Sequence, residues 1–455
     1  MADPVSQNYF PPKPDASLKA ALIAVSALLL SVALLLAGNG LQGTLIPVRG
    51  NMESFGRIEL GFLGTGYFIG FALGCLFGPA ILSRAGHIRA FMAMASIASV
   101  VVLIHVIVIE PLIWSFLRGV TGFCFAILYV VIESWLNEKS PNEHRGAVLS
   151  TYTVINLTVI TIGQLMIGLA DPKEFILFAA ASILVSLAAL PLAFTVAETP
   201  AAVTKIAWPN IMKLYRNSPV GAGGCLAVGM ANGAFWTLGP VFAQDYNLDT
   251  VMIGMFMSAV VVGGAVAQWP FGIASDRMDR RIVIIASSGL AIVAGILMTV
   301  FGQSDSGRWL LPLGALFGAG AFPIYALVVA HANDHSPPSE MIAVSSGLLL
   351  IYGLGAAVGP LIAAGMGQIA NQPLLFAYTA GVHGLLVAFV VWRMRKRSIV
   401  DESERVAFQD SAVAAQTVSP LEMIDSNPND QPPYHAETTD DGQLAPQKPA
   451  TNPPK

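Results

Sequence analysis

Apolar residues gather in twelve long runs that are separated by shorter polar segments. The runs cover residues 18–45, 59–82, 89–109, 112–136, 146–170, 174–196, 219–244, 250–274, 281–302, 309–333, 340–369 and 374–394. Each run is long enough to cross the hydrocarbon core of a bilayer as a helix. The pattern therefore predicts an all-α membrane protein with twelve transmembrane helices.

Three polar segments flank or divide these runs. Residues 1–17 are polar and contain prolines, and residues 398–455 are rich in acidic residues, Pro, Asn and Gln, so we expect both segments to be disordered. Residues 197–218 form the longest internal gap, which we interpret as a cytoplasmic linker. Its sequence WPNIMKLYR is typical of a short amphipathic helix at the membrane surface.

The first half of the chain recurs in the second half. At an offset of 193 residues, Asn39-Gly40 recurs as Asn232-Gly233, and the same offset pairs Thr44 with Thr237, Pro47 with Pro240, Gly61 with Gly254, Gly70 with Gly263 and Arg84 with Arg277. At an offset of 196, Asn137, Ser140 and Pro141 recur as Asn333, Ser336 and Pro337. The repeat predicts two pseudo-symmetric six-helix bundles, residues 18–196 and 219–397. A binding site is expected between them near the middle of the membrane.

Composition and charge support the membrane assignment and give it an orientation. The chain is 55% hydrophobic and 11% charged, whereas about 25% is usual for a soluble protein. If the N-terminus is cytoplasmic, inner segments hold sixteen Lys and Arg residues and outer loops hold four. This bias predicts that both termini lie in the cytoplasm. The outer loop between the first two helices is then Pro47–Arg57.

Two ionisable residues lie inside the fourth apolar run. Arg118 and Glu133 are fifteen residues apart, which is about 22 Å along a helix, so they cannot form a direct ion pair. Together with Gly122 and Tyr129 they fall on one helical stripe. Because charge at membrane depth normally faces protein or a watery cavity, this helix is expected to border a cavity.

The polar loops carry sequence motifs at equivalent places in the two halves. The loop after the eighth helix contains Gly272, Asp276, Arg277, Arg280 and Arg281, and a degenerate first-half copy contains Pro79, Ser83, Arg84, Gly86 and Arg89. Arg118 precedes Gly122 in the fourth helix, and Glu138, Pro141, Arg145 and Gly146 follow that helix. These motifs resemble those of the major facilitator superfamily, over roughly residues 18–397. GHIRAF and ESWLN further resemble the YcaD-like group of bacterial transporters.

The resemblance implies a gating role for the charged loops. Acidic and guanidinium groups at helix ends form hydrogen-bonded pairs, so the cluster can latch the two halves on the cytoplasmic side. The candidate gating residues are Arg84, Arg89, Glu138, Arg145, Gly272, Asp276, Arg277, Arg280 and Arg281. Ser83 removes the acidic residue of the first-half loop, and Glu138 could replace its charge. The alternative is that these charges only set the orientation.

Small residues repeat every four positions on two helices. They are Gly66, Gly70, Gly74 and Gly78 on the second helix, and Gly355 and Gly359 on the eleventh. Such stripes let helix backbones approach closely. The resemblance implies packing across the interface between the halves; the alternative is ordinary packing within one half. The family's Gly-Pro pair on the fifth helix, typical of antiporters, is replaced by Gly163-Gln164.

In the superfamily, helices 1, 4, 7 and 10 line the central cavity, and helix 5 adds further candidates. The candidate substrate-binding residues are Asn39, Gln42, Arg118, Tyr129, Asn156, Asn232, Trp236 and Tyr325. A buried Asn can equally serve as an interhelical hydrogen bond, and Trp236 can face lipid. His331 could pair with Glu133.

Glu133 is the candidate for proton coupling. Burial disfavours the charged form of a carboxyl group, so a carboxyl that alternates between two sides can load and release a proton. The alternative is a structural Glu that hydrogen-bonds a neighbouring helix.

Together with the resemblance, these features predict a secondary active transporter of the bacterial inner membrane that moves a small solute by alternating access, driven by protons. A nucleotide-binding loop, clustered catalytic groups and metal-ligand spacing are absent from the sequence, so we expect no enzyme activity, no cofactor and no metal. The expected partners are a small-molecule substrate, protons and the lipid bilayer, without nucleic acid, and the chain is expected to act as a monomer. A non-transporting membrane sensor on the same fold remains as the alternative. The two-fold duplication around a polar cavity, without a selectivity-filter sequence, argues against a passive channel.

Overall fold

The computed structural model describes residues 25–139, 144–194, 211–301, 309–337 and 341–396. In these ranges the regular secondary structure is helical, and twelve helical spans are long and apolar enough to cross a membrane. The predicted membrane protein with twelve transmembrane helices is therefore confirmed. The predicted disordered segments, and most of the linker, lie outside the described residues.

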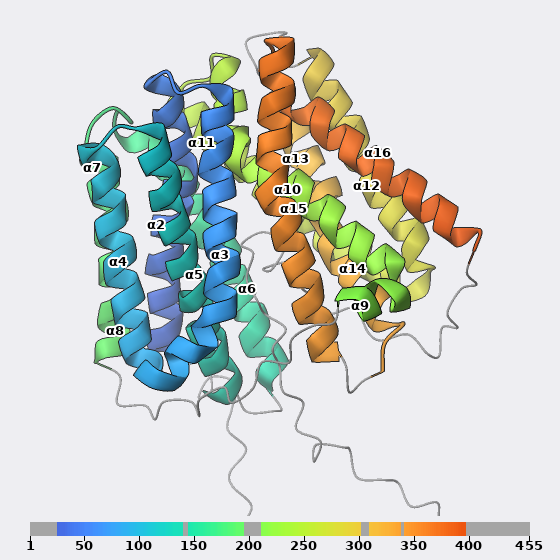
Figure 1. Ribbon diagram of the computed structural model, residues 1–455, viewed down its shortest axis with the longest axis horizontal. Helices are drawn as coiled ribbons and strands as arrows, with labels where there is room; N and C mark the ends of the chain where they lie inside the picture. Colours follow the sequence, from blue (N-terminus) through green and yellow to red (C-terminus); the bar gives the residue numbers. More distant parts are fainter. Residues whose placement is uncertain (1–24, 140–143, 195–210, 302–308, 338–340, 397–455) are drawn as a thin grey trace, which may run out of the picture. The chain divides into compact units, whose positions relative to one another are not determined.

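The first six spans come from the first half of the chain (Figure 1). Their helices are α2 (Ser26–Met52), α3 (Arg57–Ala85), α4 (His87–Ile107), α5 (Pro111–Lys139), α6 (Arg145–Leu165) with the 3-10 turn η2 (Met166–Leu169), α7 (Ile176–Leu187) and α8 (Ala189–Ala193). The short helix α9 (Ile211–Asn217) follows in the expected linker, at the end of the amphipathic sequence.

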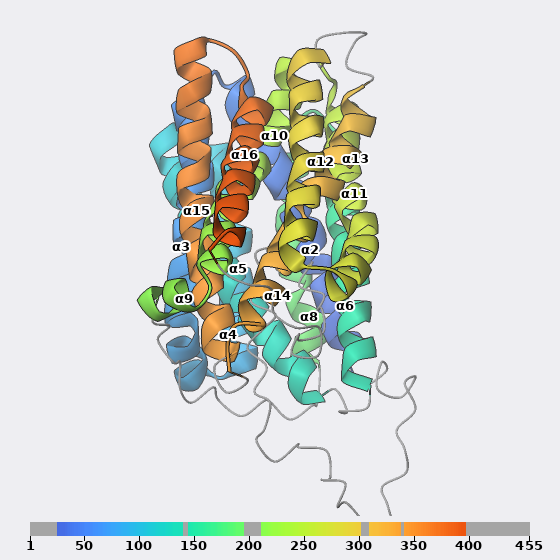
Figure 2. The same cartoon turned by 90° about the vertical axis from the view of Figure 1, so that its right-hand side faces the viewer.

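The second half supplies the other six spans. Its helices are α10 (Pro219–Asp245), α11 (Thr250–Arg277), α12 (Arg280–Phe301), α13 (Leu310–Ala321), α14 (Pro323–Asn333), α15 (Met341–Ala370) and α16 (Leu375–Met394). The halves meet where α3 runs beside α15 and α6 beside α11 (Figures 1 and 2).

Three helical runs differ from the prediction. The first helix was expected to end at residue 45, but α2 continues through Pro47 to Met52. Arg49 extends it, because its guanidinium pairs with Glu53 at 2.7 Å and donates to the Pro172 carbonyl at 3.1 Å. The sixth span breaks at Ala188 and the tenth at Phe322, where Pro323 starts a new helix. The outer loop predicted at Pro47–Arg57 is therefore shorter.

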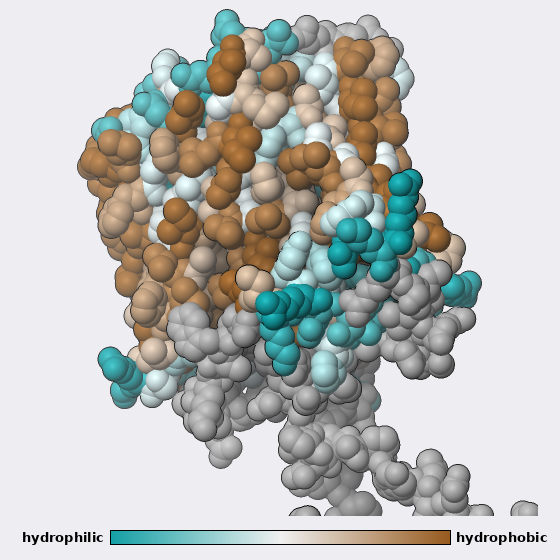
Figure 3. Space-filling view, turned by 45° about the vertical axis from the view of Figure 1, so that its right-hand side comes forward, coloured by the Kyte–Doolittle hydropathy of each residue, from teal (hydrophilic) through white to brown (hydrophobic). Residues whose placement is uncertain are grey.

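Much of the described surface is apolar. Figure 3 shows apolar residues over most of one face, with hydrophilic residues gathered at the top and lower right of the view. Large apolar side chains such as Trp269, Phe116 and Leu385 are more than 70% exposed. An apolar surface of this extent on membrane-length helices is the surface that lipid tails cover.

The glycine stripes pack within each half. A Cβ on Gly70 would collide with the Gly119 carbonyl of α5, and one on Gly359 would collide with the Met230 carbonyl of α10. The prediction that these stripes bridge the halves is therefore wrong, because each stripe faces its own bundle. Gly263, the repeat equivalent of Gly70, packs in the same way on the Ala315 carbonyl of α13.

Candidate functional site

A cavity of about 70 Å³ lies between the two halves. This is room for roughly five water molecules or a small chemical group. Its walls come from five helices: α2 gives Asn39, Gly40, Gly43 and Thr44, α3 gives Gly64, Tyr67 and Phe68, α5 gives Arg118, α6 gives Ile160 and Gln164, and α10 gives Trp236 and Thr237. Both halves therefore contribute to one cavity, as the repeat predicts.

Arg118 is the cationic side chain in this wall. Its residue is 9% exposed, and its guanidinium carbon lies 4.4 Å from the centre of the Tyr67 ring. Among the described residues, Nη1 has no hydrogen-bond partner and no carboxylate pairs with Arg118. A desolvated cation–π contact contributes about 2 kcal/mol. Removing an ion from water costs several kcal/mol, so Tyr67 offsets only part of the burial of Arg118.

Other polar groups face the same space. The Asn39 side-chain amide donates to the Tyr129 hydroxyl at 3.5 Å, which is a weak hydrogen bond. Within the described part of the chain, Gln164 Oε1 and the indole N–H of Trp236 are buried without a hydrogen-bond partner. The Trp236 ring stacks on Phe322 with 5.7 Å between ring centres, which fixes the orientation of the indole. The wall therefore offers an unused acceptor and an unused donor besides Arg118.

The predicted substrate-binding residues divide into two groups. Asn39, Arg118 and Trp236 line the cavity, and Tyr129 is not part of the lining but contacts the wall residue Asn39. The other predicted residues are buried outside its wall: Gln42, Asn156, Asn232 and Tyr325. For example, the Tyr325 ring packs edge-on against Tyr352 at 5.1 Å, inside the second half.

The sequence prediction missed several lining residues. Tyr67 and Phe68 lie on the second helix, which was not expected to line the cavity. Thr44 and Thr237 were recognised as a repeat pair but not as wall residues, although they face the cavity from opposite halves. Since equivalent positions in two related bundles lie at similar depth, the repeat itself was the usable signal.

Glu133 lies fifteen residues after Arg118 on α5 and is not part of the cavity wall described above. Its residue is 5% exposed, and its carboxyl group interacts with Cys75 and Tyr129. Tyr129 therefore connects the surroundings of Glu133 with Asn39 in the cavity wall. His331 instead lies beside His335, with 4.5 Å between ring centres, and near Arg281 and Asp279.

The halves are joined at the end of the bundle where α3 begins, which we call the Arg57 end. Arg57 Nη1 pairs with Asp245 Oδ2 at 2.9 Å, and the Asn51 amide donates to Gln244 at 2.8 Å. Asn51 and Gln244 are themselves separated by the repeat offset of 193 residues. Gly61 also packs on α15, and its repeat equivalent Gly254 packs on the end of α6.

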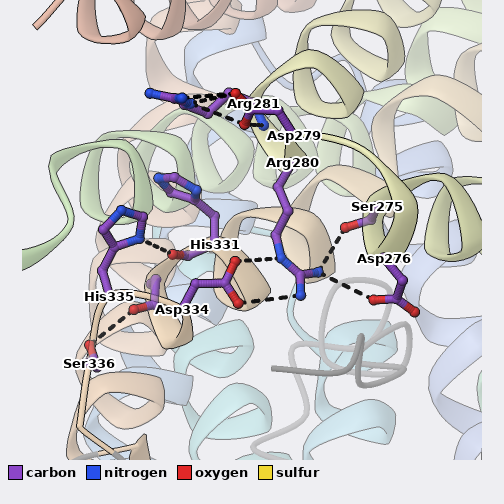
Figure 4. Close-up of polar contacts among 10 residues, drawn as sticks. Ser275, Asp276, Asp279, Arg280, Arg281, His331, Asp334, His335 and Ser336 are labelled. Atoms are coloured by element: carbon purple, nitrogen blue, oxygen red, sulfur yellow. Dashed lines mark hydrogen bonds and ion pairs between the residues drawn. The ribbon is translucent and has the colours of Figure 1, made fainter. Parts of the chain in front are cut away.

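The second-half residues predicted as a gate lie where α11 ends and α12 begins, at the other end of α11 from Thr250, which we call the Arg280 end. Figure 4 shows Asp276, Arg280 and Arg281 there with Asp334. Arg280 forms two hydrogen bonds with Asp334, at 2.7 and 3.3 Å, and a third with Ser275 at 2.8 Å. Asp276 is 3.7 Å from Arg280 and its side chain is 46% exposed. The bonds between Arg280 and Asp334 therefore tie the start of α12 to the end of α14, within the second half.

A second pair in this cluster joins Arg281 to Asp279 at 2.8 Å. Burial would raise the pKa of Asp279, but hydrogen bonds from the Arg281 side chain and backbone prevail and hold that pKa below its usual value. The remaining candidate gating residues divide by burial: Gly272 is buried, Arg84, Arg89 and Arg277 are exposed, and the side chains of Glu138 and Arg145 lie outside the described residues.

Sequence and structure comparisons place this architecture in a family. An MFS-type transporter of Yersinia pestis (strain Pestoides F) is 24% identical over 74% of this chain and 87% of its own length. The MFS-type transporter YcaD of Escherichia fergusonii is 25% identical over 82% of this chain and 97% of its own length.

Two solved structures share the fold. The nucleoside transporter NupG has a TM-score of 0.66 at 14% identity and covers 84% of this chain and 100% of its own. A D-xylose-proton symporter has a TM-score of 0.63 at 15% identity and covers 85% of this chain and 99% of its own. The family model described as Major Facilitator Superfamily matches residues 28–261 and 221–428. With its twelve spans and duplicated halves, the chain belongs to the Major Facilitator Superfamily, and it is a multi-pass membrane transporter of the YcaD-like group rather than an enzyme.

Proposed function

We propose that this protein carries a small solute across the bacterial inner membrane by alternating access. The observation that supports the proposal is a cavity built from both halves and closed at the Arg57 end by contacts between them. These contacts run between the halves and not within a bundle, so a rocking motion of the halves can break them without unfolding either bundle.

We further propose that both termini are cytoplasmic, as the Lys and Arg bias predicts. The Arg57 end then faces the periplasm, and the structure corresponds to an inward-facing conformation. Single cysteines replacing exposed Lys173 and Lys396 in a cysteine-free protein test this orientation. A membrane-impermeant maleimide should label Lys173→Cys from the periplasm and Lys396→Cys only after the membrane is opened. Labelling of both from one side would contradict the topology.

Alternating access itself is tested with a cysteine at Gly43, where an added side chain meets open space in the cavity wall. An oxidised Arg57→Cys and Asp245→Cys pair should lock the periplasmic end. In the locked protein, Gly43→Cys should react only from the cytoplasm, whereas the reduced protein should react from both sides. Periplasmic labelling that is unchanged by the lock would refute the mechanism.

Glu133 is the residue we propose for proton coupling. It is buried in the fourth span, and Tyr129 connects it to the cavity wall through Asn39. A proton taken up at Glu133 can therefore influence the site where the solute binds. This is a local coupling between two neighbouring sites, for which typical coupling energies are about 1–3 kcal/mol.

The experiment uses proteoliposomes with an imposed pH gradient and a ligand found by a thermal-shift screen of metabolites and toxic amphiphiles. Glu133→Gln should fold and bind this ligand but lose uphill accumulation, while exchange continues. Exposed Glu174→Gln is the matched control and should accumulate the ligand normally. Normal accumulation by Glu133→Gln would exclude Glu133 as the coupling site. Ligand binding without any flux in the wild type would favour the membrane sensor instead.

A further inference from the structure

The cavity wall carries one positive charge whose counterion is missing from the described protein. Arg118 is 9% exposed, its Nη1 has no hydrogen-bond partner among the described residues, and its contact is the face of the Tyr67 ring. A guanidinium group in a water-poor site is stabilised best by a carboxylate or phosphate that accepts two hydrogen bonds. The wall contains no Asp or Glu that could serve as this partner.

The other residues of the wall indicate the chemistry of the rest of the ligand. Phe68, Ile160 and the aromatic face of Trp236 are apolar surfaces in the same cavity. The indole N–H of Trp236 and Oε1 of Gln164 are buried without partners in the described structure. Arg118 is the single cationic residue in this wall, so a dianion would keep one uncompensated charge. A ligand with one negative charge, an apolar body and a few polar groups therefore fits this cavity wall.

From this geometry we infer that the substrate is a small organic monocarboxylate with an apolar or aromatic body. The carboxylate binds the Arg118 guanidinium, and the body lies toward Phe68 and Trp236. This inference rests on the proposed transport function, because it names the class of solute that occupies the transport cavity. Tyr67 holds the guanidinium plane in place, so the charge is preorganised before the ligand arrives.

Binding to the full-length protein in lipid nanodiscs tests the charge requirement. The probes are benzoate, phenylacetate and hexanoate, each compared with its neutral amide by isothermal titration calorimetry at pH 7. We expect at least one acid to bind ten-fold or more tightly than its amide. Equal binding of every acid and its amide, or no binding of any acid, would overturn the inference.

Substitution at the cavity identifies the charge that is used. Arg118→Gln should weaken binding of the acid at least ten-fold and leave the affinity for its amide within about two-fold, since only the charge-assisted bond is lost. Arg216→Gln, an exposed position on α9, is the matched control and should bind like the wild type. Undiminished acid binding by folded Arg118→Gln would refute the assignment. If that variant does not fold, the acid and amide comparison in the wild type still decides the question.

The location of the ligand is tested separately. With the native cysteines replaced, Gly43→Cys in the cavity wall should react with N-ethylmaleimide, and the acid should slow the reaction several-fold while the amide does not. Failure of the acid to protect this cysteine would place the anion elsewhere. A neutral solute that is transported although no acid binds would refute the inference and leave the transport function intact. An acid that binds and protects but is not transported would refute only the transport function.

Discussion

Asp334→Asn should be among the most destabilising single substitutions at the Arg280 end. The side chains of Arg280 and Asp334 are 1% and 3% exposed, and two hydrogen bonds join them. Removing one partner of a buried pair leaves an uncompensated charge, which costs about 3–5 kcal/mol. Asp276 cannot replace Asp334, because it lies 3.7 Å from Arg280 and is 46% exposed. Asp276→Asn should therefore cost at most about 1 kcal/mol.

The assay is equilibrium unfolding of the purified protein in mixed micelles, followed by circular dichroism. Asp334→Asn and Asp276→Asn are matched, because each replaces one carboxylate near the same guanidinium. The double variant Arg280→Met with Asp334→Leu should regain most of the lost stability, since replacing a whole buried pair by apolar groups is often nearly neutral. Equal destabilisation by the two Asn variants would refute this reasoning and return Asp276 to the role predicted from the sequence.

Three further predictions follow from other contacts. The double variant Arg57→Gln with Asp245→Asn removes an ion pair whose side chains are 32% and 20% exposed. Such a pair contributes about 0.2–1 kcal/mol, so periplasmic labelling of Gly43→Cys in the cavity should rise by roughly 1.4- to 5-fold without loss of folding. Gly70→Ala should destabilise the protein by about 1–3 kcal/mol in micelle unfolding, whereas Gly289→Ala, which meets open space, should be neutral or stabilising. The pKa of Asp279 is lowered from 3.8, so the Asp279 carboxylate stabilises the protein above pH 3.8, and this stabilisation is lost as the pH falls below 3.8. The difference in unfolding free energy between the wild type and Asp279→Asn should therefore shrink as the pH falls below 3.8.

The twelve spans could be predicted because the bilayer restricts the choice of structure. In lipid every backbone hydrogen bond must close within the segment, so an apolar run of sufficient length has to be a helix. Helix ends obey other rules. α2 extends past its apolar run because Arg49 finds partners in Glu53 and Pro172, and no hydrophobic pattern contains that information. Similarly, the break before Pro323 divides a span that is continuous in hydropathy.

The cavity wall could be predicted only in part. Asn39, Arg118 and Trp236 were identified because they are polar or amphipathic residues on helices that line the cavity in the superfamily that the sequence resembles. Gln42 and Asn156 satisfy the same criterion, yet they are buried away from this cavity. The difference is the rotation of each helix about its own axis, which depends on contacts with neighbouring helices. The glycine stripes were assigned to the wrong interface for the same reason.

The repeat contains more information about the gates than the motifs do. The offset of 196 that pairs Asn137 with Asn333 also pairs Glu138 with Asp334. Glu138 was a candidate gating residue, so its equivalent was available in the sequence as the partner of Arg280. The loop motif instead directed attention to Asp276, the more exposed of the two acids near that arginine.

The cavity has a defined position relative to the pseudo-symmetry axis that relates the two halves. Asn51 and Gln244 occupy equivalent positions and touch each other, and two equivalent positions can meet only where the axis passes between them. Thr44 and Thr237 each lie seven residues earlier, about 10 Å along their helices, and both face the cavity. The cavity therefore lies near the axis, about two helical turns below the closed end. In the proposed mechanism, separating the halves at the Arg57 end would break the contact between Asn51 and Gln244 and open the cavity on that side.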